Sequence, residues 1–458
     1  MADHLIILGA GESGIGAAIL GKKQEFTVFV SDKNVISETY RTQLEATGIP
    51  FEEGQHTDEK IFAADLIVKS PGIPDSAEII QNARSKNIPV ISEVEFAFRY
   101  KGASKFIAIT GTNGKTTTTL LTYHLLKVAG LNVAVGGNVG TSIAKLVAEG
   151  DFDFYVVEVS SFQLDGVQFF KPDIAVLLNI TPDHLDRYDH MFDQYVKSKF
   201  KILENLTNEE AFIYSADSEA ITEELSRRKV EACMFAMSVT AHEKNKAYLK
   251  GEHLIFDFNF RSRGHKYTVP ISEISLIGKH NMVNSMAAVM SALCLDIPIS
   301  KVLKGLKTFK NAPHRLEKIG KIEGVTYIND SKATNVDAVY YALDGLPSGI
   351  IWIAGGVDKG NEYEQLEELV AQKVKAIICL GKDNMVIRKF FEPKGHLVVD
   401  TLSAEEAVAK AHEIAQPKDV VLLSPACASF DLFSNYEHRG DAFRQAVHTL
   451  KTQIGIAS

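Results

Sequence analysis

The stretch Thr110-Gly111-Thr112-Asn113-Gly114-Lys115-Thr116-Thr117 separates an apolar run, Phe106–Ile109, from a helical pattern over Thr118–Val128. Backbone amides of a glycine-rich turn at a helix start cradle phosphate oxygens, while Lys115 reaches the outer phosphates and the Thr116 hydroxyl is placed to bind Mg²⁺. The complete Walker spacing would put a glycine at position 109, so the match is to the Gly-Lys-Thr end of that motif. The stretch predicts an α/β unit that binds ATP or GTP, and a chance loop is the weaker alternative.

Two predicted strands downstream of this loop end in polar residues. The run Val156-Val157-Glu158 ends one strand with a carboxylate, and Asn179-Ile180-Thr181-Pro182-Asp183-His184-Leu185-Asp186 ends the next. Because Mg²⁺ takes few protein ligands and prefers oxygen, Thr116 and Glu158 suit one ion, and His184 could support a second. The structural alternatives are that Glu158 caps the following helix and that His184 is an ordinary turn histidine.

A second glycine cluster lies near the start of the chain. Gly9-Ala10-Gly11-Glu12-Ser13-Gly14 stands between an apolar strand and an apolar helix, and Asp32 closes the next strand. Glycines let the backbone approach a diphosphate, and the acidic residue can accept a hydrogen bond from a ribose or base. The alternative is a tight strand-to-helix turn. The turn Ser70-Pro71-Gly72-Ile73 follows another strand, where ligand loops of an open parallel sheet lie.

Further polar clusters follow apolar segments in the second half of the chain. Asn281 and Asn284 are one helical turn apart, so they share a face that could read an adenine edge or cap a helix. Arg315 and Lys332, if delivered from another domain, would stabilise charge on a γ-phosphate or acyl phosphate. Lys359 and Ser429 could hold an anionic co-substrate, although plain surface turns are the alternative.

Short β-rich runs alternate with longer amphipathic patterns, which predicts an α/β fold with parallel sheets covered by helices on both faces. We expect three domains in series, at residues 1–93, 94–311 and 312–458, with a charged, β-like insertion around residues 230–275. The strands expected are Leu5–Leu8, Thr27–Ser31, Asp65–Lys69, Pro89–Ile91, Phe106–Thr110, Tyr155–Val159, Ile174–Asn179, Val325–Ile328, Gly349–Ala354, Ala376–Leu380 and Val420–Leu423.

Composition restricts the class of protein. The 458 residues are 45% hydrophobic and 23% charged with a formal net charge of −9, which excludes a disordered or coiled-coil chain and argues against a nucleic-acid partner. Four scattered cysteines indicate neither a disulfide framework nor a zinc site, so we expect a cytoplasmic protein. We expect the first residues to form a strand and not a signal peptide, and we expect no membrane insertion.

With these motifs in this order, the chain resembles the Mur ligases over essentially its whole length. These ATP-dependent, amide-forming enzymes build the peptide stem of peptidoglycan. The phosphate loop, Gly278–Asn284 and the segment from Ala312 to Asn335 are similar to family-wide features. Residues 160–164, 179–188, 329–335 and 422–433 resemble the member that adds D-glutamate.

The resemblance implies an N-terminal Rossmann-like domain that binds a UDP substrate, a central P-loop-type ATPase domain and a C-terminal Rossmann-like domain that binds D-glutamate. It also implies the reaction. The carboxylate of UDP-N-acetylmuramoyl-L-alanine attacks ATP to give an acyl phosphate, and D-glutamate displaces phosphate. Such an enzyme would act as a cytoplasmic monomer with ATP and two Mg²⁺ ions, in cell wall biogenesis and hence in cell shape and division.

The resemblance also implies roles for individual residues. ATP contacts would come from Gly111, Thr112, Asn113, Gly114, Lys115, Thr116, Thr117, Asn281, Asn284, Arg315 and Asp330. The UDP substrate would lie on Gly11, Glu12, Ser13, Gly14, Asp32, Ser70, Gly72, Asn138, Ser160, Gln163 and His184, and D-glutamate on Lys332, Thr334, Lys359, Ser429 and Tyr436. Metal ligands would be Thr116, Glu158, His184 and Lys199, the last as a carbamate, and catalysis would rest on Lys115, Glu158, His184, Lys199, Arg315 and Lys332.

Two positions depart from the family pattern. Glu12-Ser13 replaces an apolar residue and threonine, which puts a carboxylate near the expected diphosphate, and Tyr436 stands where we expect phenylalanine. Other readings are a Mur-type ligase for another amino acid, a folylpolyglutamate-synthase relative, a nicotinamide oxidoreductase and a non-catalytic nucleotide-binding regulator. We also expect a hinged enzyme, whose third domain brings Arg315 and Lys332 to the phosphates.

Overall fold

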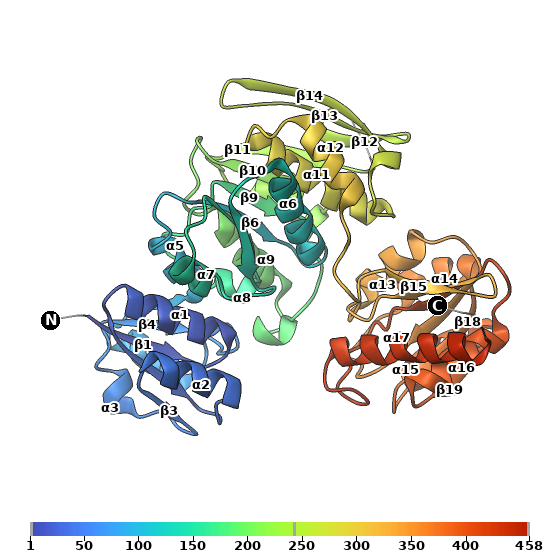
Figure 1. Ribbon diagram of the computed structural model, residues 1–458, viewed down its shortest axis with the longest axis horizontal. Helices are drawn as coiled ribbons and strands as arrows, with labels where there is room; N and C mark the ends of the chain where they lie inside the picture. The colour runs from blue at the N-terminus through green and yellow to red at the C-terminus, as the bar shows by residue number, and fades with distance from the viewer. Residues whose placement is uncertain (1–2, 241–243, 456–458) are drawn as a thin grey trace. The chain divides into compact units, whose positions relative to one another are not determined.

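The computed structural model describes residues 3–240 and 244–455, and its strands form three sheets, each with helices on both faces (Figure 1). The α/β class with three sheet-based domains is therefore confirmed. By its contacts the chain divides into two compact units, Met1–Ser275 with Met282–Phe309, and Leu276–Asn281 with Lys310–Ser458. No described helix is both long and apolar enough to cross a membrane.

The first sheet is five-stranded and parallel in the order β3-β2-β1-β4-β5. Leu5–Leu8 are all buried, as expected for a strand covered on both faces. The loops after β1 and β4 meet at the point where the strand order reverses, which is the usual ligand position in such sheets. The elements are β1 (His4–Leu8), α1 (Glu12–Lys23), β2 (Thr27–Asp32), α2 (Glu38–Thr47), β3 (Phe51–Glu53), α3 (Asp58–Ile61), β4 (Leu66–Lys69), α4 (Glu78–Ser85), β5 (Val90–Ser92) and α5 (Glu93–Arg99).

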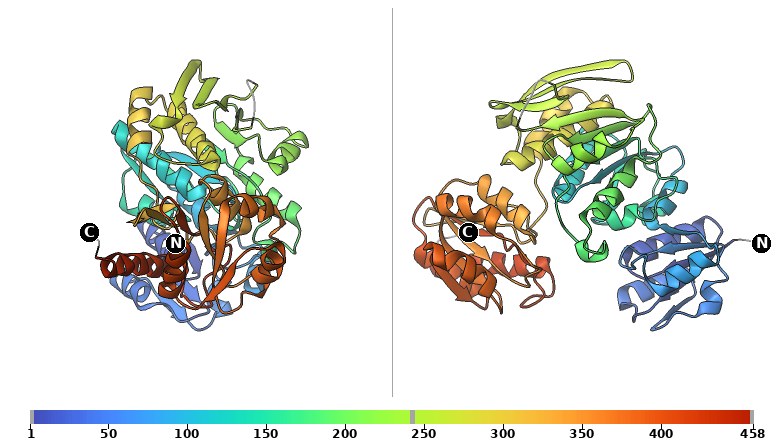
Figure 2. Two further views of the ribbon diagram at one scale, coloured as in Figure 1. Left: turned by 90° about the vertical axis from the view of Figure 1, so that its right-hand side faces the viewer. Right: turned by 180° about the vertical axis from the view of Figure 1, so that it is seen from behind.

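The second sheet has nine strands in the order β14-β13-β12-β11-β10-β9-β6-β8-β7. It is parallel from β7 to β12, and β13 and β14 extend it as an antiparallel hairpin (Figures 1 and 2). The β-like insertion predicted around residues 230–275 is thus confirmed. The elements are β6 (Lys105–Thr110), α6 (Lys115–Ala129), β7 (Val133–Gly137), α7 (Ile143–Glu149), β8 (Phe154–Glu158), α8 (Ser161–Leu164), β9 (Ile174–Leu177), α9 (Phe192–Phe200), β10 (Ala211–Ser215), α10 (Glu219–Ser226), β11 (Cys233–Ser238), β12 (Ala247–Lys250), β13 (His253–Phe260), β14 (Arg263–Pro270), α11 (Lys279–Cys294) and α12 (Ile299–Thr308).

One hydrophobic cluster runs without interruption from the first sheet into the second. Two carboxylates reinforce this junction at the start of α7. Glu12 accepts a hydrogen bond from the Ser142 amide at 3.0 Å, and Glu93 accepts from the Ser142 hydroxyl at 2.7 Å and the Ala144 amide at 2.8 Å. Burial raises the pKa of the Glu93 carboxyl. The first and second sheets are therefore joined by continuous apolar packing and by hydrogen-bonded amides at the start of α7, and not by a loose linker.

The third sheet has the order β15-β16-β20-β17-β18-β19, parallel except for the edge strand β15. Helices α13, α14 and α15 cover one face, and α16 and α17 lie side by side on the other (Figure 1). The loops after β16, β20 and β17 are therefore neighbours at the carboxyl edge. The elements are β15 (Glu317–Ile322), β16 (Val325–Asn329), α13 (Val336–Asp344), β17 (Ile350–Ala354), α14 (Glu367–Lys373), β18 (Val374–Leu380), α15 (Met385–Phe391), β19 (Val398–Thr401), α16 (Ala404–Ile414), β20 (Val420–Leu423) and α17 (Tyr436–Gln453).

Candidate active site

The phosphate loop turns from β6 into α6, which begins at Lys115, three residues earlier than predicted. Gly111 and Gly114 have φ values of +155° and +84°, in the region that favours glycine. A Cβ on Gly114 would lie 2.4 Å from Asn284 Oδ1, so the loop tolerates no side chain there. Lys115 Nζ donates to the carbonyls of Gly111 and Thr112 at 2.9 and 2.8 Å, which keeps its charge beside the turn.

Hydrogen bonds with Asn179, in the segment after β9, hold the phosphate loop in place. The Asn113 amide donates to Asn179 Oδ1 at 2.8 Å, Asn179 Nδ2 returns a bond to the Asn113 carbonyl at 3.0 Å, and the Thr112 amide donates to the Asn179 carbonyl at 2.9 Å. Sequence reasoning quoted the motif that Asn179 opens but assigned this residue no role. The available signal was its position at the end of the predicted strand Ile174–Asn179, and in the structure it lies two residues beyond β9.

Glu158 ends β8, beside β6, and is 2% exposed. Its Oε1 accepts a hydrogen bond from Asn138 Nδ2 at 2.9 Å, whereas Oε2 is buried without a hydrogen-bond partner among the described residues. An orphaned carboxylate oxygen beside a phosphate loop fits a hard cation such as Mg²⁺. Within the described residues no three His, Cys, Asp or Glu side chains converge on a metal position. A site here would therefore rest on Glu158, the Thr116 hydroxyl and substrate oxygens.

Lys199 is buried at 1% exposure, although its sequence context alone would place it on the surface. Its Nζ donates to the Gly111 carbonyl at 2.8 Å and lies 4.6 Å from the centroid of the Tyr195 ring. Desolvation, followed by the charge of Lys115, lowers the pKa of Lys199 well below its ordinary value. The structure thus brings Lys199 to the phosphate loop.

His184 lies in the loop after β9 with a φ of +52° and an exposed side chain. Its ring packs edge-on against Phe162, with centroids 5.3 Å apart, and its Nε2 is 3.6 Å from Asp183 Oδ2. Its predicted roles as a metal ligand and substrate contact stay predictions. Ser160 and Gln163 form a capping box at the start of α8, with the Ser160 amide donating to Gln163 Oε1 at 3.0 Å.

The predicted UDP-substrate residues Gly11, Glu12, Ser13, Gly14, Asp32, Ser70 and Gly72 gather where the loops after β1, β2 and β4 meet. The loops after β1 and β4 lie very close together, because a Cβ on Gly9 would be 2.7 Å from Ser70 Cβ. Asp32 Oδ2 accepts from the Ala10 amide at 2.7 Å and Oδ1 from the Asn34 amide at 2.8 Å. The carboxylate therefore braces the glycine turn, and its predicted contact with the UDP substrate stays a prediction. Arg187, not predicted, donates to the carbonyls of Pro71 and Gly72.

The two asparagines expected to read adenine have different surroundings. Asn284 Oδ1 accepts from the Thr118 hydroxyl at 3.1 Å and abuts Gly114 of the phosphate loop. Asn281 Nδ2 donates to the Ile277 carbonyl at 2.7 Å, within the other compact unit. A joint adenine contact stays a prediction.

In the second unit the remaining predicted residues Arg315, Asp330, Lys332, Thr334, Lys359, Ser429 and Tyr436 lie at or near the carboxyl edge of the third sheet. Asp330 accepts from the Leu316 amide at 3.1 Å and the Ser424 hydroxyl at 3.0 Å, and burial raises the pKa of its carboxyl to about 7. Lys332 Nζ lies 5.0 Å from the centroid of the Tyr436 ring. Lys332 and Tyr436, both assigned to D-glutamate, are thus brought together.

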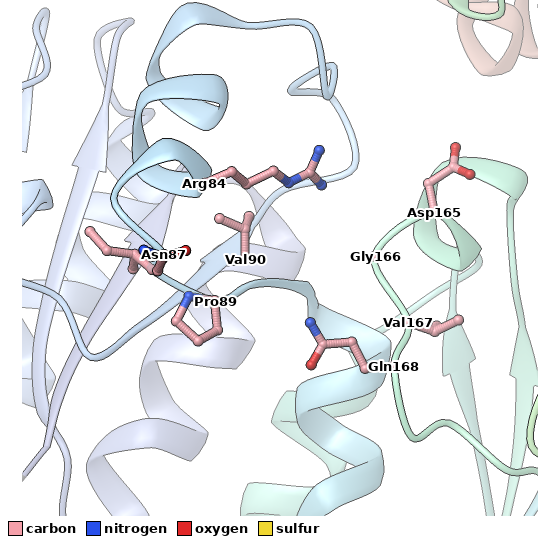
Figure 3. Close-up of a pocket in the computed structure, with 9 residues that line it drawn as sticks. Arg84, Asn87, Pro89, Val90, Asp165, Gly166, Val167 and Gln168 are labelled. Atoms are coloured by element: carbon pink, nitrogen blue, oxygen red, sulfur yellow. The ribbon is translucent and has the colours of Figure 1, made fainter.

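A groove of about 400 Å³ lies apart from these residues, between residues 84–90 and residues 165–168 of the first unit (Figure 3). Arg84 and Asp165 reach it from opposite sides (Figure 3), but each already has an ionic partner, Asp75 at 3.0 Å and Lys201 at 3.1 Å. The groove contains no predicted site residue, so the phosphate loop remains the candidate site in the first unit.

Comparison with known proteins gives family matches along the chain. Residues 3–92 match the MurD-like N-terminal domain of Mur ligases, residues 109–292 the Mur ligase middle domain, and residues 314–427 the Mur ligase glutamate ligase domain. The chain is 50% identical over 450 residues to the UDP-N-acetylmuramoylalanine–D-glutamate ligase of Christiangramia forsetii, covering 98% of this chain and 100% of the relative. The ligase of the same name from Salinibacter ruber is 39% identical over 454 residues, covering 97% of each chain.

Solved structures show the same fold at lower identity. A UDP-N-acetylmuramate-alanine ligase from Thermotoga maritima is similar with a TM-score of 0.62 and 17% identity, covering 98% of this chain and all of that chain. A pseudomurein peptide ligase type C from Methanothermus fervidus gives a TM-score of 0.61 and 22% identity, with the same coverage. A MurF ligase from Thermotoga maritima, solved in complex with ADP, gives 0.60 and 15%, covering 92% and 95%.

Proposed function

The chain belongs to the Mur ligase family, and from this premise we propose that it is the ATP-dependent ligase that joins D-glutamate to UDP-N-acetylmuramoyl-L-alanine in the synthesis of peptidoglycan precursors. The observation that carries the proposal is the phosphate loop with the orphaned Glu158 oxygen beside it, in a chain that matches D-glutamate ligases end to end. A nicotinamide oxidoreductase would leave that loop without a purpose.

The reaction has two steps. The substrate carboxylate attacks the γ-phosphorus of ATP, the bond to ADP breaks, and an acyl phosphate forms. The amine of D-glutamate then adds to the acyl carbon, the tetrahedral intermediate expels phosphate, and an amide remains after loss of a proton. ATP is needed because a carboxylate has no competent leaving group of its own.

Phosphoryl transfer depends on positioning and on neutralising charge more than on covalent help. Lys115 lies beside the loop amides and donates to the carbonyls of Gly111 and Thr112. We assign it to the outer phosphates, to which it would donate instead of these carbonyls when ATP is bound. Mg²⁺, when bound, supplies further neutralisation of phosphate charge. Glu158 and Thr116 would hold one ion, and His184 with a carbamylated Lys199 a second.

The environment of Lys199 supports its carbamylation. Burial lowers the pKa of the Lys199 amine, which favours the neutral form, and it is the lone pair of that form that can attack the carbon of CO₂. Loss of one proton then leaves a carbamate anion. That anion would face the charge of Lys115 and would supply an oxygen ligand where the unmodified amine supplies none.

Arg315 and Lys332 of the second unit are assigned to the phosphates, and Thr334, Lys359, Ser429 and Tyr436, with Lys332, to D-glutamate. The remaining ATP and UDP-substrate contacts are assigned as predicted from the sequence. The orientation of Glu12 supports the UDP assignment, because its carboxylate is turned to the Ser142 amide at the start of α7. We propose that the enzyme works as a cytoplasmic monomer, with small-molecule substrates and without nucleic acid.

The test is phosphate release from ATP and Mg²⁺ in the presence of UDP-N-acetylmuramoyl-L-alanine. Parallel reactions contain D-glutamate, L-glutamate, L-lysine or meso-diaminopimelate. Release with D-glutamate alone is expected. Release with another amino acid would retain the ligase mechanism but refute the acceptor, and no release with any of the four would refute the proposed activity.

A further inference from the structure

Arg439, in the first turn of α17, is buried at 1% exposure. Its guanidinium has no carboxylate in ion-pair contact among the described residues. Instead Nε donates to the Ser331 hydroxyl at 3.0 Å, Nη2 to the Ser331 carbonyl at 2.9 Å, and Nη1 to the carbonyls of Cys427 at 3.1 Å and Gly355 at 3.4 Å. All four of these hydrogen bonds go to neutral oxygens, and the charge of Asp431 acts on the guanidinium only from beyond ion-pair distance.

The three acceptor residues come from three different loops. Ser331 follows β16, Gly355 follows β17 and Cys427 follows β20, and these strands are neighbours in the order β16-β20-β17. The guanidinium therefore cross-links the loops at the centre of the carboxyl edge. The contact is close, because a Cβ on Gly356, at a φ of +129°, would lie 3.2 Å from Nη1 and 2.2 Å from the Ala428 carbonyl oxygen.

A buried arginine of this kind destabilises the fold. Burying a charge without a counter-ion costs several kcal/mol, and a well-packed apolar residue is often more stable in such a place. Burial disfavours the charged form and lowers the pKa of the Arg439 guanidinium to about 10. Stability alone does not account for an arginine here.

We propose that Arg439 is a positioning residue for the amino-acid acceptor, an inference that rests on the proposed function. Each loop that it holds carries a residue assigned to D-glutamate. Lys332 directly follows Ser331, Ser429 is two residues after Cys427, and Lys359 is four residues after Gly355. Tyr436 is tied in as well, because the Ser331 hydroxyl donates to its carbonyl at 2.8 Å.

Only the planar fork of an arginine reaches all three loops at once, whereas a lysine ammonium is a compact point donor. We therefore expect Arg439→Lys to retain the charge but lose the geometry. Both Arg439→Lys and Arg439→Met should raise KM for D-glutamate by roughly 10- to 100-fold, the factor carried by one or two misplaced charge-assisted hydrogen bonds. KM for ATP and for the UDP substrate should stay within about twofold.

The experiment compares two nucleophiles on the full-length enzyme. Hydroxylamine captures the acyl phosphate as a hydroxamate by attack on the acyl carbon and expulsion of phosphate, without using the amino-acid pocket. In both Arg439 variants the reaction at low D-glutamate should fall by about 10-fold or more relative to the hydroxamate rate, which changes only as far as Lys332 also acts on the phosphates. Arg444→Met is the matched control, since Arg444 lies on the same helix but is half-buried and pairs with the carboxylates of Glu317 and Asp441.

Each outcome has one meaning. An unchanged KM for D-glutamate in both variants, or hydroxamate and D-glutamate rates that fall together, would overturn the positioning role. The same holds if Arg444→Met produced the same KM increase. Wild-type enzyme that forms hydroxamate but ignores D-glutamate would instead refute the proposed acceptor, and wild-type enzyme that forms neither product would refute the proposed activity.

Discussion

Replacing Asp330 with asparagine should make the C-terminal unit more stable relative to wild type as the pH rises. The Asp330 carboxyl is 8% exposed and accepts two hydrogen bonds, yet desolvation raises its pKa from 3.8 to about 7. Below pH 3.8 the group is protonated in folded and unfolded chains alike. Between 3.8 and 7 the unfolded chain loses the proton first, so wild-type stability falls with increasing pH and levels off above 7.

The magnitude follows from those two values. At about 1.4 kcal/mol per pH unit, the difference between 3.8 and about 7 corresponds to roughly 4 kcal/mol of unfolding free energy, of which about 2.5 kcal/mol is lost between pH 5 and pH 8. The asparagine variant has no such titration. Its unfolding free energy relative to wild type should therefore increase by about 2.5 kcal/mol across that interval.

The chain provides its own probe for this measurement. Trp352 is the single tryptophan, is fully buried in β17, and donates to the Ser424 carbonyl at 2.7 Å, while the Ser424 hydroxyl donates to Asp330. Its fluorescence during urea denaturation thus reports the unfolding of the unit that contains Asp330. Asp383→Asn, at an exposed carboxylate of the same unit, is the matched control for the loss of one carboxylate. A difference for Asp330→Asn that is constant with pH, or that shrinks as pH rises, would refute the reasoning.

Three further predictions concern the first unit. Gly114→Ala should abolish detectable ATP binding by calorimetry and cost about 1–3 kcal/mol in thermal unfolding, because its Cβ would meet Asn284; Gly130→Ala, at a similar φ of +93° but with no atom within 4 Å of its Cβ, should bind ATP normally. Lys199→Met should lower phosphate release by about 100-fold while retaining or increasing the melting temperature, since it replaces a buried polar side chain with an apolar one; a lower melting temperature with full activity would contradict this. Glu95→Gln should lower unfolding stability by about 1.5–3 kcal/mol, because that buried carboxylate accepts from three consecutive amides after α8, and an unchanged melting curve would count against it.

The sequence predicted most of the strands that are buried on both faces, although it missed the interior strand β10. Leu5–Leu8, Phe106–Thr110 and Val420–Leu423 are continuous apolar runs, and each is a central strand. It missed β3, β7, β10, β15 and β19. Two causes are plain: Phe51–Glu53 is a three-residue strand with two glutamates, and Glu317–Ile322 is a polar edge strand whose pairing depends on a neighbour and not on its own pattern.

The site residues that could be predicted are likewise those whose local sequence pattern defines them. The phosphate loop is local, so its residue types and spacing define it. Lys199 shows the opposite case, because only the tertiary structure reveals that a lysine in a charged helix is buried against Gly111. The spacing that predicts Asp32 as a ligand contact carries no information on the backbone amides that its two oxygens accept in the structure. Arg439 was not predicted as a site residue because most of its acceptors are backbone carbonyls, which every residue type has.

The capped junction between the first two sheets has a consequence for synthesis on the ribosome. The N-terminal strands and helices emerge first, but the amides that satisfy Glu12 and Glu93 belong to residues 142–144, which are translated some fifty residues after Glu93. Until then these carboxylates are hydrated and the apolar faces of α1 and α5 lack part of their cover. A nascent chain arrested before residue 142 should therefore be sensitive to protease and bind chaperones, and one long enough for α7 to have left the ribosome should resist digestion across the first sheet.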